Sequence, residues 1–164
     1  MKYNTLLFLM MVLYCNTMFA QEKIDPVHWT TTVKKIDSEH YDIVFTAKLD
    51  TGWELYSQFL DSDEGPLPTT FIFQKNEDYN RDGAVRESWK NKKKVYDKMF
   101  DMTVVKYSKS AVFTQRIKAN GSGNALVMIE YMSCRATSCL PPRYVEFDID
   151  LSKITVQQPS KFVD

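Results

Sequence analysis

The chain has 164 residues, of which 21 are basic and 21 are acidic. This balance gives no reason to expect nucleic acid or an acidic surface as a partner. The length is typical of one domain whose core is large enough to fold without disulfide staples.

The first 20 residues are expected to be a signal peptide. A single lysine supplies the positive charge, residues 6–13 form an apolar run, and Ala20 is a small residue suited to cleavage after it. The run is too short to span a bilayer, which takes about 20 apolar residues, so we expect no membrane insertion. Cys15 would be removed with this segment, and lipid attachment there is disfavoured because a bulky tyrosine precedes it. Residues 21–164 are then expected to form one domain that is periplasmic or otherwise exported.

The remainder of the chain has the period-two alternation of β-strands. Apolar and polar residues alternate over residues 41–49 and, more regularly, over residues 145–151. Further strands are expected at residues 29–35, 53–59, 69–74, 103–107, 111–118 and 125–132. Turn signals separate the strands at Asp50-Thr51-Gly52, Glu64-Gly65-Pro66, Asp82-Gly83 and Asn120-Gly121.

Only residues 89–100 have a helical spacing of apolar side chains. About eight short strands separated by turns predict an all-β fold, an immunoglobulin-like antiparallel β-sandwich. A thioredoxin fold is excluded, because it needs βαβ alternation and usually a Cys-x-x-Cys at the start of a helix.

Two of the three cysteines lie close together, in the segment Cys134-Arg135-Ala136-Thr137-Ser138-Cys139-Leu140-Pro141-Pro142. They can form a disulfide only if the residues between them bend the chain back, so that the two Cα atoms come within about 7 Å. So short a ring removes little loop entropy, on the order of 2 kcal/mol, and the bridge would be a poor staple. A redox-active dithiol and a structural disulfide both fit this spacing. Arg135 would favour a thiolate at Cys134 if its guanidinium faces the sulfur.

Four methionines offer thioether sulfur that would join the two cysteines in a soft site for Cu(I). They are Met99, Met102, Met128 and Met132. Methionine at strand and loop positions is more often a packing residue. We therefore expect no metal and no cofactor, and a Cu(I)-binding protein is a less favoured alternative.

Four segments, in the same order along the chain, resemble the N-terminal periplasmic domain of the thiol:disulfide interchange protein DsbD. They are Gly52-Trp53-Glu54-Leu55-Tyr56, Gly65-Pro66-Leu67-Pro68-Thr69, Tyr96-Asp97-Lys98-Met99-Phe100 and the segment from Cys134 to Pro142. The last is the most specific, because a cysteine, a short polar spacer, a second cysteine, an apolar residue and Pro-Pro follow one another. The resemblance runs from about residue 29 to residue 151.

This resemblance implies an immunoglobulin-like domain whose cysteine pair exchanges electrons with a thioredoxin-like oxidoreductase or a membrane electron-transfer protein. By the family pattern, Cys139 would form the mixed disulfide with the partner and Cys134 would resolve it. Phe100 would be the aromatic tip of a cap loop over the pair, and Tyr56 would lie beside the active site. Asp97 flanks this loop and is a candidate proton acceptor, although an ordinary loop role is favoured.

Three departures from the family pattern matter. Glu54 occupies a position that is aromatic in the family, the spacer between the cysteines has four residues rather than five, and the 164 residues contain neither the transmembrane part nor the thioredoxin-like part of DsbD. We therefore expect a separate electron donor, so that the chain would be one component of a protein-disulfide reductase. The alternative is a non-catalytic immunoglobulin-like binding module with a structural disulfide.

Overall fold

The computed structural model describes residues 24–62, 64–153, 155 and 157–163, so the expected signal peptide lies outside it. Its strands are β1 (Val27–Lys35), β2 (His40–Leu49), β3 (Glu54–Tyr56), β4 (Thr70–Phe73), β5 (Tyr79–Glu87), β6 (Lys92–Asp97), β7 (Met102–Ser108), β8 (Ser110–Ala119), β9 (Asn124–Tyr131), β10 (Ser133–Arg135), β11 (Ser138–Cys139), β12 (Arg143–Asp150) and β13 (Lys161–Val163). No helix occurs in the described ranges, and hence none there is long and apolar enough to cross a membrane.

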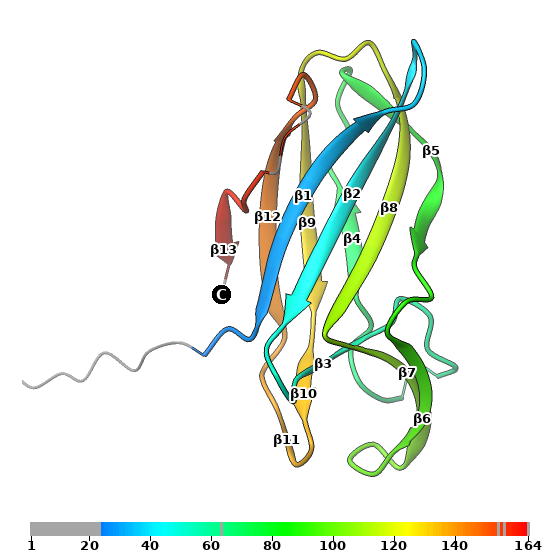
Figure 1. The fold of residues 1–164 in the computed structure, drawn as a ribbon, viewed down its shortest axis with the longest axis vertical. Helices are drawn as coiled ribbons and strands as arrows, with labels where there is room; N and C mark the ends of the chain where they lie inside the picture. The colour runs from blue at the N-terminus through cyan, green and yellow to red at the C-terminus, as the bar shows by residue number, and fades with distance from the viewer. Residues whose placement is uncertain (1–23, 63, 154, 156, 164) are drawn as a thin grey trace, which may run out of the picture.

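The strands form three antiparallel sheets (Figure 1). Sheet A has the order β1-β2-β8-β5, sheet B has the order β11-β10-β3-β7-β6, and sheet C has the order β13-β12-β9-β4. Sheets A and C pack face to face and enclose the core, whereas sheet B lies at one end of this sandwich. The prediction of an all-β, immunoglobulin-like antiparallel sandwich is confirmed.

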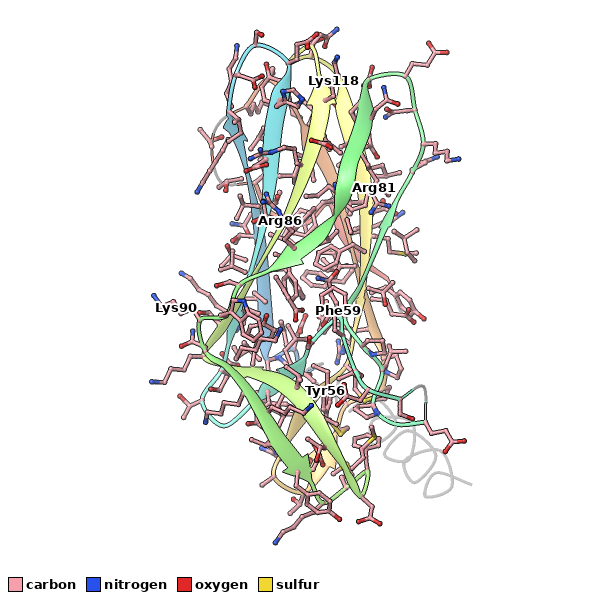
Figure 2. All side chains as sticks on the ribbon, turned by 90° about the vertical axis from the view of Figure 1, so that its right-hand side faces the viewer. Tyr56, Phe59, Arg81, Arg86, Lys90 and Lys118 are labelled. Atoms are coloured by element: carbon pink, nitrogen blue, oxygen red, sulfur yellow. A yellow bond between two sulfur atoms is a disulfide. The ribbon has the colours of Figure 1, made fainter. Side chains whose placement is uncertain are left out.

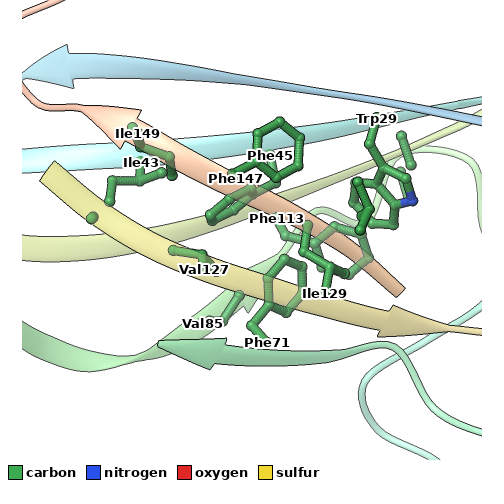
Figure 3. Packing of buried hydrophobic residues seen from close by; sticks show 14 of the residues in the cluster. Trp29, Ile43, Phe45, Phe71, Val85, Phe113, Val127, Ile129, Phe147 and Ile149 are labelled. Carbon is green, nitrogen blue, oxygen red and sulfur yellow. The ribbon is translucent and has the colours of Figure 1, made fainter. Parts of the chain in front are cut away.

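The core consists of alternate side chains from the facing strands of sheets A and C. In β2 every second residue from Tyr41 to Leu49 is buried, as the alternation in the sequence predicts. Aromatic rings bridge the two sheets, since the ring centroid of Phe71 in β4 lies 5.1 Å from that of Phe45 in β2 and 5.0 Å from that of Phe113 in β8. Figure 3 shows these rings between the strands. Burial of apolar surface between the sheets therefore holds the sandwich together.

In the region of β5 and β6, the prediction of a turn is wrong and the helical spacing of apolar residues does not correspond to a helix. Asp82-Gly83 is not a turn but lies inside β5, where the register against β8 shifts between Asp82 and Arg86. Gly83 has a φ of 75°, which glycine adopts without steric penalty, so the same residue suits a bulge as well as a turn. Residues 89–100 contain strand β6 rather than a helix. β6 is the edge strand of sheet B and only Asp97 among its residues is buried, so it has no clear period-two pattern.

Replacing Phe113 with alanine is expected to destabilise the domain by about 3–5 kcal/mol, because the lost ring packs against Trp29 and Phe71 in the closed core. Urea denaturation measures the free energy of unfolding. As a control, Phe162→Ala removes a ring in β13 that is 52% exposed, and it should cost about 0.5 kcal/mol or less. Equal losses in the two variants would contradict this description of the core.

Candidate redox site

The cysteine pair closes a tight β-hairpin at the end of sheet B. β10 and β11 pair antiparallel, with Cys134 opposite Cys139 and Arg135 opposite Ser138. Residues 136 and 137 form the turn. The two cysteine Cα atoms are 4.0 Å apart and the sulfurs form a disulfide. The short spacer thus supplies one further cross-strand pair and a two-residue turn, which is why the cysteines face each other.

The register of sheet B places side chains from several strands on one face with the cysteines. Residues directly opposite each other in paired strands share a face. Glu54 lies opposite Cys134, and Lys106 lies opposite Tyr56. Tyr56 marks this end of the molecule in Figure 2. A small apolar cluster on this face, here called the site cluster, has the buried members Tyr56, Val104 and Cys134, with Leu60, Val95, Phe100, Met102, Met132 and Cys139 packed against them.

Residues 98–101 connect β6 to β7 and are here called the cap loop. The ring of Phe100 meets the ring of Tyr56 edge-on, with centroids 6.0 Å apart. Phe100 packs in the site cluster, and its neighbour Met99 contacts the second cysteine, with its Sδ 3.2 Å from Cys139 Sγ. Because a disulfide sulfur carries no hydrogen, this is a sulfur–sulfur contact and not a hydrogen bond. Cys134 beneath it is only 4% exposed, so the cap loop and Cys139 together shield it.

Asp97, the last residue of β6, ties the cap loop to the sheet. Its Oδ2 accepts a hydrogen bond from the Tyr56 hydroxyl at 2.9 Å, and its Oδ1 accepts one from the Met99 backbone N–H at 3.0 Å. The Lys106 ammonium lies 3.3 Å from Oδ2 of Asp97 and 2.5 Å from Oε2 of Glu54. Glu54, at a position where the resemblance led us to expect an aromatic residue, therefore forms an ion pair beside Cys134.

The network sets the protonation of Asp97 and Tyr56. Burial alone raises the pKa of Asp97. The hydrogen bonds from Met99 and Tyr56 and the charge of Lys106 lower this pKa by more, so that it lies below its usual value. Burial, and then the adjacent Asp97, raise the pKa of Tyr56. At neutral pH Asp97 is thus an ionised acceptor and Tyr56 a protonated donor, an arrangement that favours a positioning role for Asp97 over proton acceptance.

Arg135 lies on the other side of the hairpin from the sulfurs. Its guanidinium is 5.2 Å from the ring centroid of Trp53, in cation–π geometry, and the residue is exposed. Neighbouring residues of a strand point to opposite faces, so the buried side chain of Cys134 and the exposed one of Arg135 diverge. The condition under which Arg135 would favour a thiolate is therefore not met.

Glu87 at the end of β5 orients the chain just after Tyr56, a role that the sequence analysis missed. Its carboxylate accepts hydrogen bonds from the Ser57 hydroxyl at 2.5 Å and from the Gln58 N–H at 3.0 Å, and it also pairs with Lys92. The Glu87 side chain is only 3% exposed, so its charge depends on these partners. The strand β3 ends at Tyr56 rather than continuing to residue 59 as predicted, and these contacts with Glu87 hold the two residues that follow it.

The methionines considered for a soft metal site are only partly brought together. Met102 and Met132 pack in the site cluster and Met99 contacts Cys139. Met128 lies in β9 opposite Ile72 of sheet C, outside the cluster. Among the described residues, no group of three or more His, Cys, Asp or Glu side chains is placed to hold a metal ion.

The sequence of residues 23–151 matches the family described as thiol:disulfide interchange protein DsbD, N-terminal. The chain belongs to this family. The match spans both cysteines, Tyr56 and the cap loop, and it confirms the resemblance to the DsbD N-terminal domain. A search among curated proteins finds no significant match.

Two solved structures are similar to this member of the DsbD N-terminal family. The DsbD N-terminal domain of Neisseria meningitidis, in its reduced form, has a TM-score of 0.56 at 17% identity, over 86% of this chain and 98% of that one. The N-terminal periplasmic domain of ScsB from Proteus mirabilis has a TM-score of 0.57 at 17% identity, over 84% of this chain and 50% of that one. At this identity the similarity concerns the fold, so the roles of single residues must be argued from their contacts.

Asp97→Asn is expected to lower the free energy of unfolding by about 1–3 kcal/mol at neutral pH, because the charge that Tyr56 and Lys106 bind is lost. The pKa of Asp97 is lowered in the folded protein, so its contribution is complete above the unfolded pKa of about 3.9 and is lost as pH falls through the folded value. The difference between wild type and variant should therefore shrink in acid. Urea denaturation from neutral pH to about pH 2 measures it.

Asp61→Asn is the matched control for this experiment. Asp61 also forms an ion pair, with Lys94 at 3.0 Å, but its side chain is 66% exposed and water screens the interaction. We expect almost no change in stability at any pH. If Asp97→Asn behaved like this control, the cap loop would not depend on the Asp97 charge.

Proposed function

We propose that this protein is an exported thiol-disulfide exchange protein that passes reducing equivalents through Cys134 and Cys139 to or from a thioredoxin-like partner. The observation that carries the proposal is the placement of the pair. The pair lies in a hairpin with a two-residue turn, outside the main core and under the four-residue cap loop. A staple at this place would add little, because the hairpin register already holds the two cysteines opposite each other.

The exposure of the two sulfurs supports different roles for them. Cys139 is half-buried and Cys134 is 4% exposed, so a partner reaches Cys139 first. In the dithiol form, the Cys139 thiolate attacks a partner disulfide and forms a mixed disulfide, releasing one partner thiolate. The Cys134 thiolate then attacks Cys139 Sγ and releases the second. The protein loses two electrons and two protons, and the partner gains both.

The proposal extends to export and to the partner. Residues 1–20 have the character of a signal peptide, and the DsbD domain to which the family refers is periplasmic, so we assign residues 21–164 to the mature domain outside the cytoplasm. The partner is a thioredoxin-like oxidoreductase or a membrane electron-transfer protein, because the pair needs a protein donor or acceptor of two electrons.

The reduction potential of the pair tests the proposal. We expect a midpoint of about −200 to −270 mV, the range of thioredoxins and glutaredoxins, since the pair must exchange with such proteins in both directions. Equilibration against a glutathione or dithiothreitol series, followed by alkylation and mass measurement, gives the value. A disulfide that resists reduction until the domain unfolds would instead identify a structural bridge in a binding module.

The order of attack predicts different behaviour of two single-cysteine variants. Cys134→Ser should accept glutathione from glutathione disulfide at Cys139 about tenfold faster than Cys139→Ser accepts it at Cys134, because access limits the exchange rate. Intact mass against time gives both rates, and matching urea transitions would establish that both variants are folded. Equal rates, or a faster Cys134, would reverse the assignment.

A further inference from the structure

Met99 is held over Cys139 by anchors on both sides of it. Its backbone N–H donates to Asp97 Oδ1 at 3.0 Å, and the next residue, Phe100, packs edge-on against Tyr56. The Met99 side chain itself forms no part of these anchors. Its sulfur lies 3.2 Å from Cys139 Sγ, so it can leave the cysteine while the cap loop stays attached to the sheet.

Met99 is also the methionine most open to solvent in the part of the chain that the structure describes. It is 44% exposed, whereas Met102, Met128 and Met132 are half-buried. Oxidation of methionine by peroxide follows access to the thioether sulfur. Met99 therefore combines the greatest exposed fraction among the described methionines with direct contact to the sulfur that a partner must reach.

We propose that Met99 is an oxidation site, and that its conversion to the sulfoxide uncovers Cys139 and speeds exchange at the disulfide. A hydroperoxide transfers one oxygen to Sδ as its O–O bond breaks. The thioether loses two electrons, and the peroxide is reduced to water, or to an alcohol if it is organic. In the disulfide form Cys134 and Cys139 carry no thiolate that would consume the peroxide first.

The sulfoxide uncovers Cys139 because its new oxygen is a strong hydrogen-bond acceptor. At its present position the Met99 sulfur meets a disulfide sulfur, which has no hydrogen to donate. Leaving such a polar group without a donor is unfavourable, and water is adjacent to the side chain. The sulfoxide therefore turns outward and opens the path to Cys139.

This inference rests on the proposed function, since it concerns the rate at which the same disulfide is attacked. Its consequence is that the disulfide form is reduced faster after exposure to peroxide. Methionine sulfoxide reductases would restore the cover. The device would match the supply of reducing equivalents to oxidative stress outside the cytoplasm.

The experiment starts from the disulfide form, treated with limiting hydrogen peroxide that catalase then removes. Intact mass should show one added oxygen, and peptide mapping should place it on Met99. Reduction by dithiothreitol, quenched by alkylation at intervals, should be about three- to tenfold faster than in the untreated protein.

Three variants make the assignment specific. Met99→Leu keeps an apolar cover that peroxide cannot oxidise, so its reduction rate should not respond to peroxide. Met128→Leu removes a half-buried methionine of β9 that lies outside the site cluster, and it should respond as wild type does. Met99→Gln replaces the thioether with a polar amide that should turn outward as the sulfoxide does, so its disulfide should be reduced quickly without peroxide.

Two results would overturn the inference alone: unchanged reduction of the singly oxidised protein, or acceleration that persists in Met99→Leu. A disulfide that dithiothreitol cannot reduce in any folded form would sink the proposed function as well. The two failures are thus distinguishable in one set of rates.

Discussion

The arrangement of the site depends on one buried carboxylate. Asp97 accepts the Tyr56 hydroxyl from β3, the Met99 N–H from the cap loop and the Lys106 ammonium from β7. These three donors come from separate segments of the chain, and their bonds to Asp97 do not involve the disulfide. Leaving a buried carboxylate without these partners would cost much free energy. The three segments therefore keep their relative positions. The cap loop is therefore placed by electrostatics rather than by apolar packing alone.

The sandwich supports this network because one face of sheet B packs in the main core and the other face carries the site cluster. In β3, Leu55 belongs to the main core while its neighbour Tyr56 belongs to the site cluster. In β7, Tyr107 packs against Phe113 of the main core, while Val104 lies in the site cluster. Because successive side chains of a strand point to opposite faces, each strand joins the core to the site without an additional element. The disulfide can then open and close without disturbing the hydrophobic burial that holds the fold.

The parts of the structure that could be predicted from sequence are those with one face in the core and the other in water. β2 and β12 show this alternation, and the Cys134–Cys139 spacing fits a bend that brings the sulfurs together. β6 could not be predicted, because an edge strand with exposed lysines has no buried face that marks it. Glu87 was missed for another reason. Its partners Ser57 and Gln58 lie about 30 residues earlier in the chain, in the loop after β3, and no local pattern connects them with Glu87.

The cover over Cys139 follows from a contact that sequence does not encode locally. The resemblance to the family predicted an aromatic tip at Phe100, which packs on Tyr56 in the site cluster, but it did not point to Met99, whose sulfur touches Cys139. The position of Met99 over the cysteine depends on the path of residues 98–101, and the bond from the Met99 N–H to Asp97 helps to set that path.

The cap loop is held over Cys139 only by modest interactions, so it slows attack on the disulfide without preventing it. The edge-on aromatic pair of Phe100 and Tyr56 is worth about 0.5–1.5 kcal/mol beyond area burial. This interaction slows attack by roughly two- to tenfold, since each 1.4 kcal/mol is a factor of about ten. Small thiols are therefore discouraged rather than excluded. Under the proposed function, a protein partner that docks around the hairpin would gain binding energy with which to displace the cap loop. The site thus selects by the binding energy of the partner, which is how a disulfide under one short loop can discriminate among thiols.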